Sequence, residues 1–234
     1  VQQDGQVHLR AKEDLPPCLI RHDSPYDPEA RYSTKRDRSW IGYKVHLTES
    51  CDEQQVHLLT HVETTFAPIS DGEQTPRIQQ ALAARELLPA EQLMDSGYVD
   101  AEVLVSSRQD YGVQLLGPVR PDVSWQAQHA EGYDISQFRI DWNSQVATCP
   151  QGQQSVIWHP RQAARGQEVI TIRFATPTCA ACEVRAHCTR SPVQPRQLTV
   201  PVQSQHEALQ ARRREQHTKD FKDRYAARAG IEGT

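Results

Sequence analysis

The sequence predicts an α/β protein that is interrupted by a β-rich module. Three observations support this class. Up to residue 118, strand-like and helix-like segments follow one another in the order β-β-α-β-α-β. From about residue 119 to residue 204, short polar strands and four cysteines replace that pattern. Helical periodicity returns at His206 and continues to about Arg228.

Length and composition limit the possible classes. A chain of 234 residues has room for one or two domains. Apolar residues make up 37 %, and no stretch approaches the roughly 18 apolar residues of a membrane helix. The N-terminus lacks the charged and apolar regions of a signal peptide. Because both ends look cut, we expect a fragment of a longer protein.

Shifts in composition predict four segments. Residues 1–38 are rich in turn formers and form an irregular connector from a missing N-terminal region. Residues 39–118 are the first part of the α/β domain, and residues 119–204 are the inserted β-rich module that contains the cysteines. Residues 205–234 form a truncated C-terminal helix that returns to the α/β domain.

The α/β part begins with a hairpin. Apolar residues alternate over 40–49 and over 56–64, and a short polar turn separates the two runs. Thr75 and Pro76 are typical of a helix start, so a helix is expected from there to about Leu88.

The next three elements are a strand, a helix and a strand. Short apolar runs predict strands over 91–94 and 113–116, and a helix is expected between them over 100–110. In the module, polar strands are expected over 133–142, 155–158 and 169–174.

Four cysteines of the module have the spacing of a structural zinc site. Cys179 and Cys182 are two residues apart, a spacing that lets two thiolates reach one tetrahedral Zn²⁺. Cys188 follows closely, and Cys149 is expected to supply the fourth ligand across a hairpin. A polar segment with few large apolar residues needs such a staple.

Other interpretations of the cysteines stay open. All four could be reduced structural thiols, and the two-residue spacing also suits a redox pair. His159 and His187 are alternative metal ligands. Cys18 and Cys51 are isolated, and we interpret them as ordinary thiols.

Asp95 is the first candidate catalytic carboxylate. It follows a short apolar strand and precedes Gly97, where the chain must turn into a helix. Active sites of α/β sheets are built at the carboxyl ends of strands. From its position alone, an aspartate there more often caps the following turn.

Three residues near the end of the chain form a second candidate site. Tyr225, Arg228 and Glu232 are three and four residues apart, so they share one face of a continuing helix. A solvated ladder of salt bridges is the plain interpretation of such a stripe. Gly230 lowers helix stability there by about 1 kcal/mol relative to alanine.

Together the two sites make the sequence resemble the DDE transposases of bacterial insertion sequences. In the subgroup with an inserted β-domain, the second catalytic acid lies in an Asp-x-Gly-Tyr-like context, which residues 95–98 match. The third acid lies in a Tyr-x2-Arg-x3-Glu-x6-Lys signature, whose first three letters are matched by residues 225–232. Residues 24–32, residues 42–46 and the loop at 70–71 are similar as well.

The resemblance implies a fold and a cellular setting. The fold is a ribonuclease-H-like mixed sheet with flanking helices, interrupted by an inserted β-domain, which here is the module with the zinc site expected from the cysteine spacing. The setting is the bacterial cytoplasm, at the nucleoid, with a homodimer acting on the ends of a DNA element and on target DNA. The family's first catalytic Asp lies on the first strand of the sheet, whereas Asp27 lies in a turn. We therefore expect the first Asp upstream, and a fragment that is inactive alone.

The resemblance also implies metal-dependent DNA chemistry. Asp95 and Glu232 are the expected ligands of Mg²⁺ or Mn²⁺. Arg228 is expected to contact a DNA phosphate, and Tyr225 a backbone oxygen. The whole chain has a net charge of −4, but residues 205–228 carry seven Lys or Arg against four acids. Five of these basic residues are the expected sequence-independent phosphate contacts: Arg212, Arg213, Arg214, Lys219 and Lys222.

Two alternatives to a transposase remain. A metal-dependent nuclease of the same fold shares the first chemical step but performs no strand transfer. A zinc-stabilised DNA-binding or interaction module performs no catalysis at all.

Overall fold

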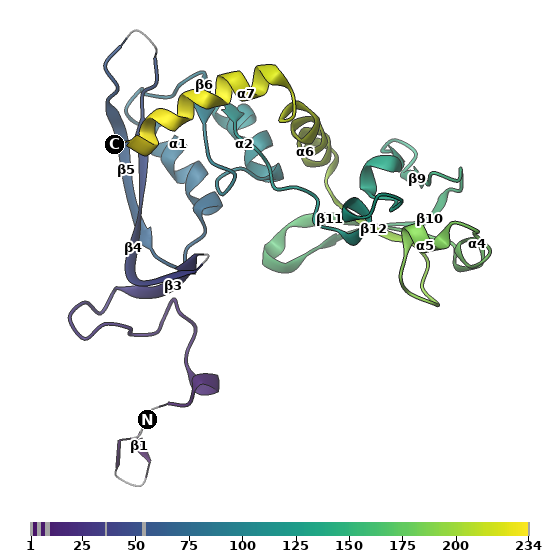
Figure 1. Cartoon of the computed structure of the whole chain (residues 1–234), viewed down its shortest axis with the longest axis horizontal. Coiled ribbons are helices and arrows are strands. Elements are labelled where there is room, and N and C mark those ends of the chain that lie inside the picture. The colour runs from purple at the N-terminus through teal and green to yellow at the C-terminus, as the bar shows by residue number, and fades with distance from the viewer. Residues whose placement is uncertain (1, 4–5, 8–9, 36, 53–54, 234) are drawn as a thin grey trace. The chain divides into compact units, whose positions relative to one another are not determined.

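In a computed structural model the chain forms two compact units (Figure 1). Unit 1 comprises residues 1–88 and 228–234, and unit 2 comprises residues 89–227. In the part of the chain that the structure describes, no helix is long and apolar enough to cross a membrane. The described residues are 2–3, 6–7, 10–35, 37–52 and 55–233.

The main sheet of unit 1 has three antiparallel strands in the order β3-β4-β5. The predicted hairpin is confirmed, because Tyr43 is paired with Phe66 and Leu47 with Val62. The strands and the short elements before them are β1 (Gln2–Gln3), β2 (Gln6–Val7), η1 (Lys12–Asp14), β3 (Arg31–Lys35), β4 (Arg38–Glu49) and β5 (Leu59–Phe66).

This hairpin buries its polar face. His46, His61 and Thr65 are buried, whereas the apolar alternates Val45 and Leu47 are about half exposed. Helix α1 packs against β5, the strand that carries His61 and Thr65. Alternation thus identifies the strands correctly but does not identify the buried face.

The helix predicted from Thr75 is confirmed but ends early. It comprises η2 (Asp71–Gln74) and α1 (Thr75–Ala83), and Ile78 and Leu82 are its buried apolar residues. The N–H of Leu87 donates to the carbonyl of Leu82 at 2.9 Å, and Glu86 adopts a left-handed φ of 58°. A left-handed residue at this place closes a helix.

Unit 2 begins with two parallel strands and the helix between them. These elements are β6 (Glu91–Leu93), α2 (Ala101–Tyr111) and β7 (Gln114–Leu116), and all three match the predicted segments within a residue. Asp100 caps α2 by accepting from the N–H groups of Glu102 and Val103, each at 2.9 Å. Gly112 ends the helix with a φ of 68°.

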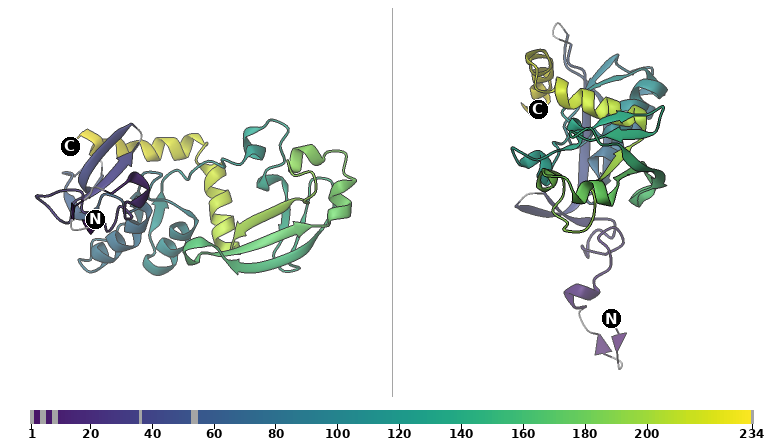
Figure 2. Two further views of the ribbon diagram at one scale, coloured as in Figure 1. Left: turned by 90° about the horizontal axis from the view of Figure 1, so that it is seen from below. Right: turned by 90° about the vertical axis from the view of Figure 1, so that its right-hand side faces the viewer.

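The β-rich part of unit 2 encloses a small core. Phe138, Ile172, Phe174 and Leu198 are buried there. The long strands β10 and β11 lie side by side and pair antiparallel (Figure 2). The elements are α3 (Trp125–Gln128), η3 (Ile135–Gln137), β8 (Arg139–Asp141), β9 (Val146–Thr148), β10 (Ser155–Gln162), η4 (Ala164–Gly166), β11 (Glu168–Phe174), α4 (Thr176–Ala180), α5 (Arg185–Cys188) and β12 (Gln197–Pro201).

One strand of this part is shorter than predicted. The expected strand over 133–142 forms only as β8, because Asp134 accepts from the N–H of Ser136 and starts a 3-10 turn. The strand expected over 155–158 continues instead to Gln162.

The predicted C-terminal helix is broken. It consists of α6 (Gln203–Glu215), α7 (Lys219–Tyr225) and the 3-10 segment η5 (Ala226–Gly233). The break lies at Thr218, whose hydroxyl accepts from the N–H of Phe221 at 3.3 Å and begins a new helix.

The α/β class is confirmed as a mixture of helices and small sheets. The strands expected in one mixed sheet form separate sheets among the described residues: β3-β4-β5 is antiparallel, and β6-β7 is parallel. Strands β6 and β7 have only three residues each.

Candidate active site and cysteine pocket

Asp95 lies at the carboxyl end of β6, as its sequence position predicts. The N–H of Met94 donates to the carbonyl of Leu116 at 3.0 Å, which extends the β6-β7 pairing to the residue before Asp95. The chain then turns, with the N–H of Tyr98 donating to the carbonyl of Asp95 at 2.9 Å. The Asp95 side chain is exposed, and its Oδ1 accepts from the N–H of Ser96 at 2.7 Å. The carboxylate is therefore accessible to a cation or to DNA.

The backbone around Asp95 is closely packed against the end of β7. A side chain at Gly117 would collide with the carbonyl oxygen of Met94 and with Val99. Only glycine allows this approach. The position of the Asp95 turn is thus set by the strand next to it.

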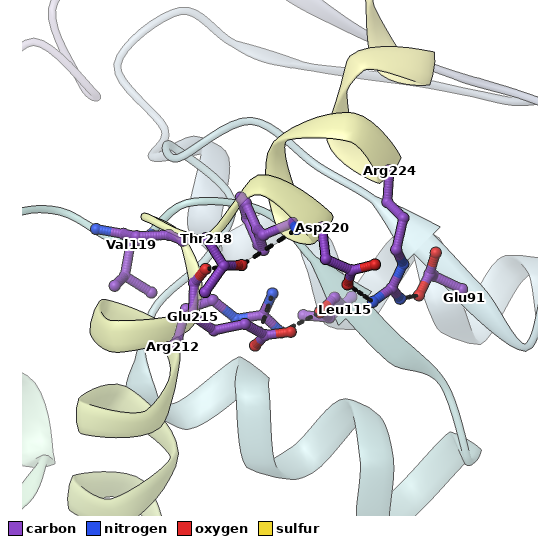
Figure 3. Close-up of polar contacts among 10 residues, drawn as sticks. Glu91, Leu115, Val119, Arg212, Glu215, Thr218, Asp220 and Arg224 are labelled. Carbon is purple, nitrogen blue, oxygen red and sulfur yellow. Dashed lines mark hydrogen bonds and ion pairs between the residues drawn. The ribbon is translucent and has the colours of Figure 1, made fainter.

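Helix α6 is held to the same pair of strands by two side chains (Figure 3). Nη2 of the buried Arg212 donates to the carbonyl of Leu115 at 2.6 Å. The N–H of Val119 donates to Oε1 of Gln216 at 2.9 Å. Both contacts join residues that are 97 positions apart in the sequence.

Helix α7 contacts β6 through an ion pair (Figure 3). The guanidinium of Arg224 pairs with the carboxylate of Glu91, at the start of the strand that leads to Asp95. Asp220, one turn earlier on α7, also pairs with Arg224 at 3.5 Å. The hydrogen bond that Arg224 donates to Glu91 raises the pKa of Arg224. This contact thus links the strand before Asp95 to the helix that ends at Tyr225.

The three residues of the C-terminal signature do not share one α-helix. Tyr225 is the last residue of α7 and stacks on Phe221, with ring centroids 5.7 Å apart. Arg228 and Glu232 lie in η5, where three residues complete a turn. The single α-helix expected over the three residues is therefore not formed, because Tyr225 ends α7 and the other two residues lie in a 3-10 segment. The side chain of Glu232 lies outside the described part, and its convergence with Asp95 stays a prediction.

The basic residues of the C-terminal helices fall into two groups. Arg212 is only 6 % exposed, with its guanidinium 5.3 Å from the ring centroid of Phe221. Burial lowers the pKa of Arg212, and the side chain serves packing instead of the expected DNA contact. Arg213 is half-buried, 4.0 Å from Asp122. Three other basic side chains are exposed: Arg214, Lys219 and Lys222.

The four cysteines of the predicted zinc site line one pocket of unit 2. This cysteine pocket has a cavity volume of about 30 Å³, and Cys149, Cys179, Cys182 and Cys188 all contribute to its wall. Three of them also pack against the small core of the β-rich part. The chain thus brings together thiols that are up to 39 positions apart (188 − 149).

The thiols of this pocket influence one another. Burial and, to a smaller extent, the other three thiols raise the pKa of Cys188 to about 11, while Arg196 opposes the shift. All six cysteines of the chain, each within the described residues, are free thiols.

The described residues contain no group of three or more His, Cys, Asp or Glu side chains already arranged to hold a metal ion. The two histidines considered as alternative ligands do not line the cysteine pocket. His159 is exposed on β10. The ring of His187 packs against Tyr133, with centroids 5.6 Å apart, and lies 3.7 Å from Glu131.

Residues 148–234 match the family model described as a transposase DDE domain. The C-terminal part of the chain is therefore similar to a transposase DDE domain. No curated protein and no solved structure matches it. The resemblance drawn from the two motifs is therefore confirmed at the level of the DDE transposase family.

The matched segment contains some parts of this transposase and omits others. It includes the four cysteines and the signature at Tyr225, Arg228 and Glu232, whereas Asp95 lies before it. The inclusion of the signature agrees with the order of motifs on which the resemblance rests.

Sequence reasoning missed four residues that position the transposase elements. They make the contacts described above, but none belongs to a motif with known chemistry. The sequence offered a signal for only two of them: Arg224 is next to Tyr225, and Gly117 forms a Gly-Pro pair with Pro118. The four are Glu91, Gly117, Gln216 and Arg224.

Proposed function

We propose that this protein is the catalytic transposase of a DNA element, performing divalent-metal-dependent cleavage and strand transfer. The observation that carries the proposal is the match of residues 148–234 to a transposase DDE domain. The exposed carboxylate of Asp95 at the end of a parallel strand supports it.

Asp95 and Glu232 are the proposed ligands of the divalent cation. The Asp95 carboxylate fits this role, because it is an exposed hard oxygen donor of the kind that Mg²⁺ and Mn²⁺ prefer. A bound cation would neutralise charge that develops at the phosphorus and lower the pKa of a bound water or 3′-hydroxyl.

DNA contacts are proposed on the C-terminal helices. Lys219 and Lys222 are exposed on α7 and offer attraction to phosphates without sequence preference. Arg228 is proposed to bind a phosphate near the reacting one, and Tyr225 to hydrogen-bond a backbone oxygen. Arg213 belongs to the same proposed surface, while Arg212 is left out because it is buried.

The proposal includes a ribonuclease-H-like catalytic domain made of residues 39–118 and 205–234, with residues 119–204 as an insertion. Antiparallel pairing of β4 with β5 and parallel pairing of β6 with β7 are both needed in a mixed sheet of that kind. A homodimer that holds two element ends together is part of the proposal.

The proposal is tested in the natural protein that carries this sequence, with DNA ending in the element's own termini and with Mg²⁺. Asp95→Asn and Glu232→Gln are each expected to lower cleavage more than about 100-fold, because several kcal/mol of charge stabilisation are lost. DNA binding, measured by fluorescence anisotropy, is expected to stay within about twofold. Asp110→Asn, an exposed carboxylate on α2, is the matched control and is expected to cleave normally.

Two results would contradict the proposal. Normal cleavage by Asp95→Asn would remove Asp95 from the active site. If the wild-type protein cleaved DNA but did not join a pre-cleaved end to a target, it would be a nuclease instead of a transposase.

A further inference from the structure

We propose that the cysteine pocket binds one zinc ion through Cys149, Cys179, Cys182 and Cys188. The pocket is lined by all four thiols, and three of them pack against the core of the β-rich part. Such a site would be structural, since four protein ligands leave no position for a substrate. This inference goes beyond the proposed function and does not depend on it.

The backbone near each ligand is already fixed by hydrogen bonds. After Cys149, the N–H of Gly152 donates back to the carbonyl of Cys149 at 2.9 Å, and Gly152 adopts a left-handed φ of 76°. The N–H of Cys182 donates to the carbonyl of Cys179 at 3.4 Å. These are two tight turns, each with a cysteine at its start, and they face one pocket from different segments of the chain.

The backbone at Cys188 is fixed by two hydrogen bonds to its carbonyl oxygen. That oxygen accepts from Nε2 of Gln126 at 2.9 Å and from Nη1 of Arg196 at 3.0 Å. The position of the fourth ligand therefore does not depend on the metal.

Zinc binding requires the four sulfurs to converge on one point. Zinc–sulfur bonds of about 2.3 Å in a tetrahedron place the sulfurs about 3.8 Å from one another. The described side chains are not in that arrangement. Rotation about the Cα–Cβ bond of a cysteine moves its sulfur between staggered positions, so the pocket closes on an ion by changes of rotamer.

The charges balance in a site of this kind. Zn²⁺ binds as four S–H bonds lose their protons to solvent and four Zn–S bonds form, which leaves a net charge of −2. Arg185 and Arg196 line the same pocket and offset that charge. Nε of Arg196 is buried without a hydrogen-bond partner among the described residues, and a nearby thiolate would supply an acceptor.

Zinc fits this pocket better than other common cations. Four thiolates are soft ligands, which exclude Mg²⁺ and Ca²⁺. The β-rich part also has few large buried apolar side chains, so a metal staple contributes substantially to its stability.

The test uses the whole chain, purified under reducing conditions, and measures zinc by mass spectrometry after gel filtration. We expect one zinc per chain in the wild type and in Cys51→Ser, whose exposed thiol is remote from the pocket lining. We expect Cys149→Ser and Cys182→Ser to lose most of the zinc. Replacement by Co²⁺ in the wild type is expected to give the visible absorption bands of tetrahedral thiolate coordination.

Thiol labelling keeps the test decisive if a variant fails to fold. With zinc, maleimide is expected to modify only Cys18 and Cys51 rapidly in the wild type, and a chelator is expected to expose the other four. The proposal is wrong if wild-type protein supplied with zinc holds no zinc and the chelator does not change how fast maleimide modifies the four cysteines. It is also wrong if mass spectrometry finds a Cys179–Cys182 disulfide in the air-exposed native protein with zinc present, which would indicate a redox pair.

Discussion

Arg224 on α7 forms an ion pair with Glu91 at the start of β6, across 133 residues of sequence. Both side chains are about one-third exposed. Glu91 begins the strand that leads to Asp95, and Arg224 directly precedes Tyr225 of the transposase signature. The pair therefore joins the neighbourhoods of the two motifs within unit 2.

A double-mutant cycle of Arg224→Ala and Glu91→Gln should show a coupling of about 0.2–1 kcal/mol in the free energy of unfolding, because partly exposed ion pairs are screened by water. The measurement is urea unfolding of the four proteins at low salt, and the coupling should shrink at high salt. The control cycle uses Lys219 and Asp223, a more exposed pair within α7, and should give a smaller value. Equal coupling energies in the two cycles would mean that the contact between Arg224 and β6 stabilises the fold no more than an exposed ion pair does.

Arg212→Ala is expected to destabilise unit 2 by about 2–3 kcal/mol. The substitution removes a charged hydrogen bond to the Leu115 carbonyl and the packing of the guanidinium on Phe221. Arg214→Ala, an exposed arginine on the same helix, is the matched control and should change stability by less than about 0.5 kcal/mol. Thermal or urea unfolding compares the two, and similar losses would contradict the buried role of Arg212.

The protein should lose stability as the pH falls below about 6.5, the ordinary histidine value. Burial lowers the pKa of His46, with Lys44 acting in the same direction and Asp71 and Glu63 opposing it. The unfolded chain then binds a proton that folded His46 refuses, so acid favours unfolding until the pH reaches the folded pKa. Burial lowers the pKa of His206 in the same way.

The check is the free energy of unfolding at about pH 7.5 and about pH 5.5. His46→Gln should reduce the difference between the two, because glutamine does not titrate. Exposed His159→Gln should leave the difference unchanged. An unaltered pH dependence in His46→Gln would show that His46 is not the group responsible.

Lys222→Ala is expected to weaken DNA binding about equally for all sequences and to reduce the slope of log affinity against log salt by about 1. Lys219→Ala should have a smaller effect, because Nζ of Lys219 already pairs with Asp223 at 2.6 Å. Anisotropy titrations at several salt concentrations measure both slopes. If neither variant alters its slope, α7 lies outside the DNA interface.

Local signals predicted much of the α/β part. Helix α2 is capped by Asp100 and ends at Gly112, so both of its ends are determined by neighbouring residues in the sequence. The β4-β5 hairpin was likewise found from alternation. Asp95 falls at the end of β6 as expected, because the order of a strand and a turn is local information.

Features that depend on distant contacts were not predictable. Sequence alone gave no reason to bury Arg212, since its partner Leu115 lies 97 residues away. The buried face of β4 could not be identified from alternation either, because a polar residue such as His46 can be buried when it hydrogen-bonds to Thr65. The helix break at Thr218 was not predicted. Thr218 can be recognised as an N-cap only once α7 is known to begin after it.

Gln216 and Arg212 hold the returning helix α6 to the residues where the chain leaves β7. The β-rich stretch therefore begins and ends at neighbouring points, which these two hydrogen bonds hold together. Changes in the length of that stretch would leave these two hydrogen bonds, and with them the turn at Asp95, in place. Insertions and deletions in the exposed turns between residues 120 and 200, away from the buried core and the four cysteines, should accordingly be tolerated most easily during evolution.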